Sequence, residues 1–514
     1  MAVETELKLR VSSEQFARLR RHALLKAHSP TRPVTRRLYN IYYDTPKLDL
    51  FQSGMALRLR RVGQQWLQTL KGGGSVKAGL HQRSEWEGRV RGAALDFSGL
   101  AAEWDVHLPA SWRKRLRPAF VTDFSRTSRM LLWQGAQIEL CMDQGMISTE
   151  QRSTQLCELE LELKSGEPQQ LFALAQALLD IVPFELEAVS KAEQGYRLLS
   201  GYLAHPVKSV APVLAETDTL AEVLKTQIWS CLQHFQDNLS GAMGRGAVDS
   251  DDAEYLHQMR VALRRLRVVL RMAEKFRADE NLAALNRDIS ALFVTLGRIR
   301  EWDVFIAKTI QPMCTQIKGH SGLQDLLAVS LRQRSVCHAV LHDALQAREL
   351  QRLLLRFAVW MHGDYWLHTE WHQAAENRRE AQNFASLRLR KLAKQFARSA
   401  HHLNSVDPLQ LHGLRILAKK LRYSAEIFLH LYDRRKTKPF LAALGGVQDV
   451  LGQVNDDVAA QRLLDRLAED PSLAAHQEAI VLSRGWITHD LSGQLAVLHK
   501  SMQFFNKQAV FWKK

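Results

Sequence analysis

The stretch Val3-Glu4-Thr5-Glu6-Leu7-Lys8-Leu9-Arg10 decides the fold of the first part of this chain. It alternates between charged and apolar residues, and successive side chains of a β-strand point to opposite faces. Glu4, Glu6 and Lys8 therefore share one face. Two carboxylates about 7 Å apart repel by roughly 2 kcal/mol at an effective dielectric near ~20. Such a pair indicates a bound cation or ligand, with a solvated face of an edge strand as the alternative.

Several later segments repeat this division into an apolar face and a charged face. In Cys157-Glu-Leu-Glu-Leu-Glu-Leu, glutamates alternate with leucines, and in Met55-Ala-Leu-Arg-Leu-Arg the charges are arginines. The charged positions are Arg58, Arg60, Lys71, Arg83, Glu85, Glu87, Glu158, Glu160 and Glu162. A solvated sheet would mix both signs with Ser, Thr and Gln. A closed antiparallel barrel accommodates the pattern, with charges in the lumen and apolar faces outside against helices.

A lumen that carries both signs of charge suits one class of chemistry. Arginine and lysine can bind phosphate oxygens, while carboxylates hold a hard divalent cation such as Mg²⁺. Phosphoryl transfer needs both, because its catalysis depends on positioning and on neutralising spread negative charge. The sequence therefore predicts a triphosphate in the lumen.

Residues 1–200 resemble the CYTH superfamily of triphosphate-processing enzymes, beginning with the Glu-x-Glu-x-Lys motif at Glu4, Glu6 and Lys8. The resemblance implies an eight-stranded antiparallel tunnel with flanking helices. It also implies metal-dependent hydrolysis of inorganic triphosphate to diphosphate and phosphate, with Mg²⁺ or Mn²⁺. Members of the family also hydrolyse thiamine triphosphate or cyclise ATP, so a class IV-type adenylate cyclase is an alternative. The catalytic candidates are Glu4, Glu6 and Lys8.

The same resemblance assigns further roles. The expected substrate-binding residues are Lys8, Arg58, Arg60, Lys71, Arg83, Glu85, Arg126 and Lys191. The expected metal ligands are Glu4, Glu6, Asp143, Glu158, Glu160 and Glu162, and the choice among the three late glutamates stays open. Arg129 is an alternative to Arg126, because it would face the other way on a strand.

The whole chain has 514 residues, a formal net charge of +16 and a pI of about 9.7, which indicate two or three domains and an anionic partner. No apolar run approaches the roughly 20 residues of a membrane helix, and the charged N-terminus does not resemble a signal peptide. The five cysteines are odd in number and lack metal-type spacing, which favours a reduced cytoplasmic setting.

Strand alternation gives way to helical periodicity after Pro212, which predicts a tunnel domain at 1–204, a linker at 205–216 and an all-helical domain at 217–514. The helical region contains a repeat. His257-Gln-Met-Arg-Val-Ala-Leu-Arg-Arg-Leu-Arg matches His412-Gly-Leu-Arg-Ile-Leu-Ala-Lys-Lys-Leu-Arg at an offset of 412 − 257 = 155. We expect two pseudo-symmetric helical bundles, at about 217–365 and 366–514.

Each copy of the repeat puts a basic face on one helix, because its cations recur every three or four residues. The expected polyanion-binding residues are His257, Arg260, Arg264, Arg267, His412, Arg415, Lys419 and Arg422. A solvated face is the alternative, and Glu301 and Asp303 are expected to pair with these cations. The paired motifs resemble the CHAD domain, which implies polyphosphate binding. A non-catalytic polyphosphate sensor is a further alternative. Nucleic acid is disfavoured, because aromatics do not interleave with the basic residues.

Overall fold

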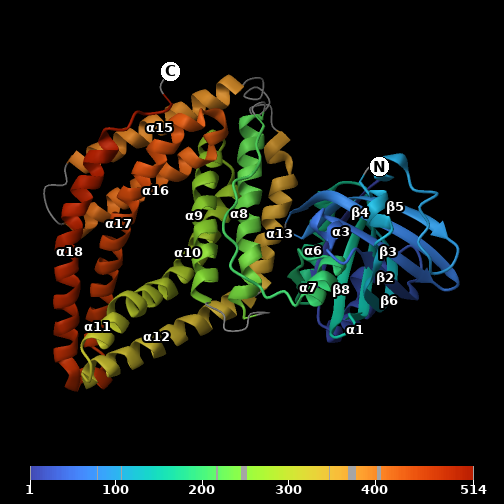
Figure 1. The fold of residues 1–514 in the computed structure, drawn as a ribbon, viewed down its shortest axis with the longest axis horizontal. Coiled ribbons are helices and arrows are strands. Elements are labelled where there is room, and N and C mark those ends of the chain that lie inside the picture. The colour runs from blue at the N-terminus through green and yellow to red at the C-terminus, as the bar shows by residue number, and fades with distance from the viewer. Residues whose placement is uncertain are drawn as a thin grey trace. The chain divides into compact units, whose positions relative to one another are not determined.

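The computed structural model describes residues 2–77, 79–105, 107–215, 218–244, 252–346, 348–367, 378–401 and 407–512 (Figure 1). The chain forms two compact units. The first runs to His205 and also includes Gln346–Gly363, whereas most of the remaining chain forms the second. Residues 216 and 217, where the predicted linker ends and the helical region begins, lie outside the described residues.

The first unit contains a closed antiparallel barrel. Its strands are β1 (Ala2–Arg10), β2 (Val34–Asp44), β3 (Met55–Val62), β4 (Gln65–Lys77), β5 (Leu80–Val90), β6 (Arg117–Trp133), β7 (Ala136–Ser148) and β8 (Ser153–Ser165). They follow the order β5-β4-β3-β2-β6-β7-β8-β1, and pairing of β1 with β5 closes the barrel. The two-residue strand β9 (Glu185–Leu186) adds to β1. The predicted eight-stranded barrel is therefore confirmed.

The alternation of β1 sets which face points outward. Leu7 and Leu9 are fully buried on the outer side, where β1 and β8 pack against α6 (Pro168–Ile181). The other helices of residues 1–205 are α1 (Ser13–Arg21), α2 (Ala23–Ala27), α3 (Asp49–Gln52), α4 (Ala102–Asp105), α5 (Ala110–Arg113) and α7 (Lys191–Ser200). Because the leucines are buried under a helix, the charged residues of β1 face the lumen.

Helix α7 packs closely against β6. Tyr196 is buried, and its ring lies 5.1 Å from that of Phe120, which stacks on Tyr42 at 4.5 Å. A Cβ added at Gly195 would lie only 2.0 Å from the Phe120 ring, so a glycine is required for this approach. The close packing fixes the start of α7, and with it the position of Lys191.

A helix from far along the chain, α13 (Arg348–His362), also belongs to the first unit and packs on α6. The buried Gln351 side chain accepts a hydrogen bond from the Leu186 backbone N–H at 3.0 Å. Arg352 and Asp180 form an exposed ion pair at 2.9 Å. Residues 348–362 therefore complete the surroundings of the short strand β9.

We expect Gln351→Ala to destabilise the first unit by about 1–2 kcal/mol, because the Leu186 N–H loses its acceptor in a partly buried place. Arg352→Ala is the matched control on the next residue of α13. It removes an exposed ion pair and should cost only ~0–1 kcal/mol. Urea unfolding followed by tryptophan fluorescence measures both. Equal, negligible effects would contradict a structural role of α13 in this unit.

The second unit is entirely helical. Its main helices are α8 (Leu220–Ala242), α9 (Asp252–Phe276), α10 (Glu280–Phe305), α11 (Gln311–Gln316), α12 (Ser321–Gln346), α15 (Arg378–His401), α16 (Pro408–Ile427), α17 (Arg434–Ala468) and α18 (Gln477–Asn506). A π-helical turn, η1 (Ile306–Ile310), follows α10, and short 3-10 turns are η2 (Asp364–Leu367), η4 (Leu429–Leu431) and η5 (Pro471–His476). No described helix is both long enough and apolar enough to span a bilayer.

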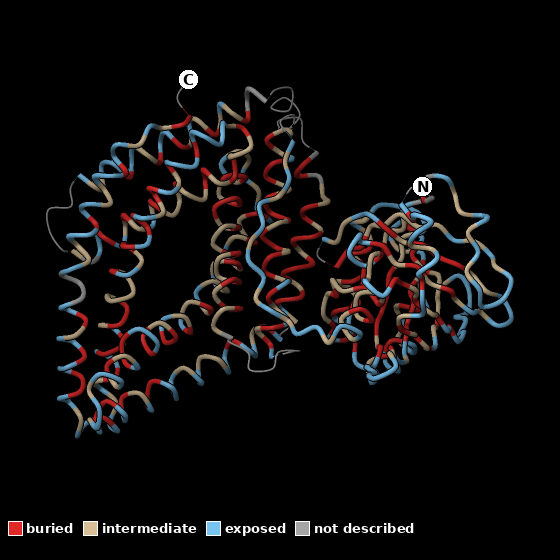
Figure 2. The backbone as a smooth tube through the Cα atoms, viewed as in Figure 1, coloured by how far each residue is buried: buried red, intermediate tan, exposed pale blue. Residues whose placement is uncertain are grey.

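The sequence repeat is also a structural repeat. Helices α8, α9 and α10 pack in succession, as do α15, α16 and α17, and α9 packs against α16. The apolar stripe beside the first basic face is buried, and it consists of Leu256, Met259, Leu263, Leu266 and Leu270. Figure 2 marks buried positions along the helices of the second unit. The all-helical second part with two related halves is therefore confirmed.

Candidate functional site

The barrel encloses a lumen of about 620 Å³ whose walls are densely charged. Of the residues predicted to bind substrate or metal, those that line it are Glu4, Glu6, Lys8, Arg58, Arg60, Lys71, Arg83, Glu85, Arg126, Glu160, Glu162 and Lys191. Asp143 and Glu158 are buried beside it. The structure therefore brings residues chosen from alternation and from the CYTH resemblance to one cavity.

One carboxylate, that of Glu160, contacts three cations. Lys8 lies opposite Glu160 in the pairing of β1 with β8 and contacts its Oε1, and Lys191 Nζ lies 2.7 Å from the same oxygen. Arg126 contacts the other carboxylate oxygen. Burial opposes the charge of Glu160, but Lys191, Lys8 and Arg126 outweigh it and hold its pKa well below the usual range. Glu160 is therefore ionised.

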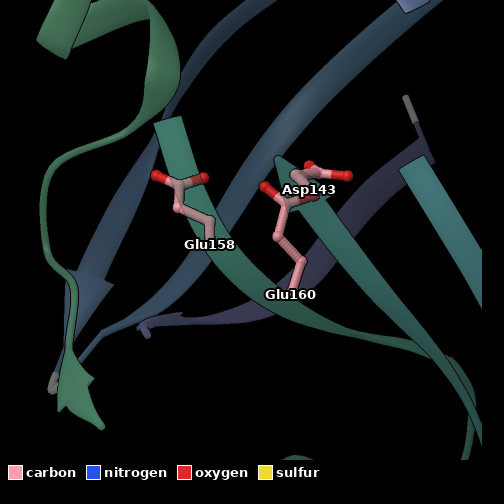
Figure 3. A group of neighbouring side chains, drawn as sticks. All are labelled: Asp143, Glu158 and Glu160. Carbon is pink, nitrogen blue, oxygen red and sulfur yellow. The ribbon is translucent and has the colours of Figure 1, made fainter. Parts of the chain in front are cut away.

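Glu160 also belongs to a group of three buried carboxylates with Asp143 and Glu158 (Figure 3). One oxygen from each lies within 4.8 Å of the other two. Asp143 comes from β7 and the glutamates from β8, and Asp143 and Glu158 are direct neighbours across that pairing. Burial raises the pKa of Glu158 despite its contact with Lys191. The three residues offer only oxygen ligands, which Mg²⁺ and Mn²⁺ prefer.

Lys191 already neutralises this acidic group. Its Nζ lies 2.8 Å from Asp143, 2.5 Å from Glu158 and 2.7 Å from Glu160. Arg126 also makes a two-pronged contact with Asp143, at 2.7 and 2.6 Å. The donor chemistry fits a divalent cation, and a cation bound there would replace part of the Lys191 contacts.

The other predicted metal ligands lie in different surroundings. Glu4 pairs with Lys71, which is also 3.3 Å from Glu85. The Glu6 carboxylate lies 2.9 Å from the Lys8 ammonium. Burial alone would raise the pKa of Glu6, but Lys8 outweighs this effect and lowers the pKa to about 2. Glu162 pairs with Lys164 at 2.5 Å. The predicted metal ligands therefore do not form one group. Of the three late glutamates, only Glu158 and Glu160 belong to the buried acidic group with Asp143.

Strand β3 supplies two of the arginines that line the lumen, Arg58 and Arg60. Arg58 lies 3.8 Å from Glu85, and Arg60 Nε donates to Asn40 Oδ1 at 2.8 Å. Burial, together with the neighbouring cations Arg58 and Arg126, lowers the pKa of Arg60 to about 10. A buried guanidinium surrounded by other cations is stabilised by a bound anion.

The remaining predicted arginines of the lumen lie on β5 and β6. Arg83 lies directly opposite Glu4 in the pairing of β1 with β5, so it faces the lumen as expected. Between the two alternatives on β6, Arg126 holds Asp143 and Glu160, whereas Arg129 lines the lumen and forms no ion pair with a carboxylate of the described residues. The structure thus favours Arg126.

Sequence reasoning missed three polar residues of the site. Asn40 contacts Arg60, Tyr42 hydrogen-bonds to Arg58, and Gln194 Nε2 donates to Glu158 at 2.7 Å. Asn40 and Tyr42 could have been found by extending the alternation along Leu38-Tyr-Asn-Ile-Tyr. Gln194 follows Lys191 by three residues, which puts both on one helix face.

The two basic motifs of the second unit face each other. Arg264 of α9 donates to the Tyr423 hydroxyl of α16 at 3.4 Å. Burial and the nearby Arg264 and Arg415 lower the pKa of Lys419 to about 6. Burial and Arg264 likewise lower the pKa of Arg260 to about 10. Cations of α9 and α16 therefore repel one another although the two helices are far apart in the sequence. This repulsion indicates one shared cationic surface.

Other members of this predicted set have different partners. His257 is half-buried near Arg300, and Arg267 lies 4.9 Å from the Phe293 ring. His412 Nδ1 is 2.8 Å from Asn455 Oδ1. Arg422 pairs with Glu426 one helical turn away, at 2.8 Å, so its charge is partly neutralised.

The acids near the basic faces have several partners. Asp303 pairs with Arg334 at 2.5 Å, and Glu301 lies 4.0 Å from Arg466. Both arginines lie outside the repeated motifs. Glu301 also acts on Arg260, and Asp456 acts on Arg415 and Lys419, so these acids offset part of the charge of the basic faces.

Comparison with known proteins agrees with both units. Residues 2–196 match the CYTH domain model, and residues 226–465 match the CHAD domain model. An inorganic triphosphatase from Haemophilus influenzae is 37% identical over 169 residues, which are 31% of this chain and 46% of that protein. The chain thus spans less than half of that relative's length.

Two solved structures are similar. The CHAD domain of the plant Ricinus communis is 30% identical, with a TM-score of 0.51 over 59% of this chain and 98% of that one. A Hippeastrum protein with a dominant triphosphatase activity is 20% identical, with a TM-score of 0.28 over 39% of this chain and 97% of that one. By the two domain models, the chain contains a CYTH domain at residues 2–196 and a CHAD domain at residues 226–465.

Proposed function

We propose that the lumen of the first unit hydrolyses inorganic triphosphate to diphosphate and phosphate. The observation that carries the proposal is the group of lumen cations Arg58, Arg60 and Arg126 together with the buried carboxylates that Arg126 contacts. The similarity to an inorganic triphosphatase supports this substrate, although it covers only part of that protein. In the reaction, water attacks a terminal phosphorus, the anhydride P–O bond breaks, and diphosphate leaves.

The proposed role of each side chain in the lumen follows from its charge. Lysines and arginines bind the phosphate oxygens, and they are Lys8, Arg58, Arg60, Lys71, Arg83, Arg126 and Lys191. Glu85 holds Lys71 in place. Glu4 and Glu6 orient the attacking water, and Glu4, whose pKa is raised by burial, takes up its proton. Asp143, Glu158 and Glu160 would hold Mg²⁺ or Mn²⁺, which neutralises phosphate charge when bound.

Phosphate release in the presence of tripolyphosphate, ATP or thiamine triphosphate tests this function. Each is assayed with Mg²⁺, with Mn²⁺, and after removal of metal by a chelator. We expect rapid, metal-dependent release from tripolyphosphate and slow release from ATP. Formation of cyclic AMP from ATP would instead establish a cyclase. Binding of tripolyphosphate without any hydrolysis would place the protein among non-catalytic sensors.

For the second unit we infer binding of inorganic polyphosphate or a similar polyanion. The facing cations of α9 and α16 support this role, because a linear anion relieves their repulsion. We also propose a cytoplasmic location, for which the five free cysteines are the supporting observation.

The pKa of Lys419 predicts how polyphosphate binding depends on pH. Free Lys419 has a lowered pKa of about 6, so it is charged near pH 5 and neutral near about pH 7.5. A bound polyanion favours the charged form, and binding should weaken by about 5- to 10-fold from about pH 5.5 to about 7.5. Isothermal titration calorimetry with polyphosphate measures this change.

Lys419→Arg is the matched variant, because arginine keeps its charge over the whole range. It should bind tightly at both pH values and flatten the profile. The charged groups that act on Lys419 are Arg264, Arg415, Asp456 and Arg260. A profile as steep in Lys419→Arg as in the wild type would contradict the assignment to Lys419.

A further inference from the structure

The guanidinium of Arg60 is held in the lumen by a neutral amide rather than by a carboxylate. Asn40 lies directly opposite Arg60 in the pairing of β2 with β3, and its Oδ1 accepts from Arg60 Nε at 2.8 Å. Two neighbouring lumen arginines lie near acids, since Arg126 contacts Asp143 and Arg58 is 3.8 Å from Glu85. The contact of Arg60 therefore orients a cation without cancelling its charge.

The orientation of the Asn40 amide is fixed from its other side. Asn40 is only 1% exposed, and its Nδ2 donates to Thr122 Oγ1 at 2.9 Å and to the Thr122 carbonyl oxygen at 3.4 Å. Thr122 is fully buried and lies opposite Asn40 in the pairing of β2 with β6. Because the amide nitrogen must face Thr122, the amide oxygen faces Arg60.

Arg60 consequently presents a charge that the protein leaves unpaired. Among the residues that the structure describes, no carboxylate lies within 4.0 Å of its guanidinium nitrogens. Arg58 and Arg126 are the cations that act most strongly on it. A polyvalent anion in the lumen would complete its surroundings, since desolvated charges need a partner.

We propose that Asn40 is a positioning residue that aims Arg60 at the triphosphate and keeps its full charge available for the substrate. The inference rests on the proposed function of the lumen and adds a residue that governs affinity for highly charged phosphate. A carboxylate at position 40 would hold the guanidinium equally well, but it would compete with the substrate for it.

Asn40→Asp tests the proposal, because it changes charge with almost no change of shape. We expect the KM for tripolyphosphate to rise by about tenfold or more, with a much smaller fall in kcat, because a charge-assisted contact is lost on binding. The melting temperature should change little, because the new ion pair with Arg60 offsets the loss of the hydrogen bonds that the Asn40 amide nitrogen donates to Thr122. Asn281→Asp, at an exposed position of α10, is the matched control and should leave KM unchanged.

A structural role alone would give a different result. In that case Asn40→Asp would lower the melting temperature and kcat while the KM stayed at the wild-type value, and this outcome would overturn the proposal. Thr122→Val provides a second check, since it releases the amide and should raise the KM without adding charge. If wild-type protein neither binds nor hydrolyses tripolyphosphate, the proposed function fails. If it does both and Asn40→Asp has a wild-type KM, only the positioning role fails.

Discussion

Replacement of Lys8 by alanine should lower kcat for tripolyphosphate by about 10²- to 10³-fold, the usual effect of removing one pre-positioned group that stabilises transition-state charge. Lys8 is buried in the lumen, with its ammonium 2.9 Å from Glu6 and in contact with Glu160. Burial alone would lower the pKa of Lys8, but these carboxylates outweigh this effect and raise the pKa. Lys8 therefore keeps its positive charge. It can therefore meet negative charge as it develops on the phosphate.

Steady-state phosphate release from tripolyphosphate measures this loss. Lys26→Ala is a matched control, because Lys26 is an exposed lysine on α2. It should retain wild-type activity. Circular dichroism of Lys8→Ala verifies the fold, and Lys191 and Arg126 still neutralise Glu160 in that variant. A folded Lys8→Ala protein with wild-type kcat would contradict a role for Lys8 in the reaction.

The second large effect concerns stability. Glu160→Gln should destabilise the first unit by about 3–5 kcal/mol, because Lys8, Arg126 and Lys191 lose the carboxylate that all three contact. The pKa of Glu160 is depressed in the folded protein, so its contribution is present above the unfolded pKa of about 4.3 and is lost as pH falls. The difference from wild type should therefore shrink below about pH 4.

Urea unfolding at about pH 7 and about pH 3.5 measures both parts of this prediction. Glu193→Gln is the control, since Glu193 forms a partly exposed ion pair with Arg197 one turn away on α7. Such a pair contributes only ~0.3–0.5 kcal/mol. A destabilisation in Glu160→Gln that is no larger than in the control would show that the three cations do not depend on Glu160.

The sequence predicted the barrel because its signal is local and periodic. Leucines opposite charged residues in β1 and β8 define two faces, and the structure buries those leucines. Periodicity could also place Glu4, Glu6 and Lys8 on one face. It could not show which acid meets which cation, because those contacts join strands far apart in sequence, such as Lys8 with Glu160.

The limits of sequence reasoning are clearest for neutral residues and for long-range packing. Asn40 carries no charge, so a search for charged faces passes over it, although its contact with Arg60 shapes the lumen. The packing of α13 on α6 joins segments more than 160 residues apart, as the hydrogen bond between Leu186 and Gln351 shows. A repeat in the sequence reveals α9 and α16, but not that residues 348–362 belong to the first unit.

The most direct test of the account is ³¹P nuclear magnetic resonance of tripolyphosphate incubated with the full chain and Mg²⁺ or Mn²⁺. The account predicts that the tripolyphosphate signals are replaced by equal amounts of diphosphate and phosphate, and that Lys8→Ala converts far more slowly. An unchanged spectrum with wild-type protein, at a concentration where calorimetry shows tripolyphosphate bound, would contradict hydrolysis in the lumen.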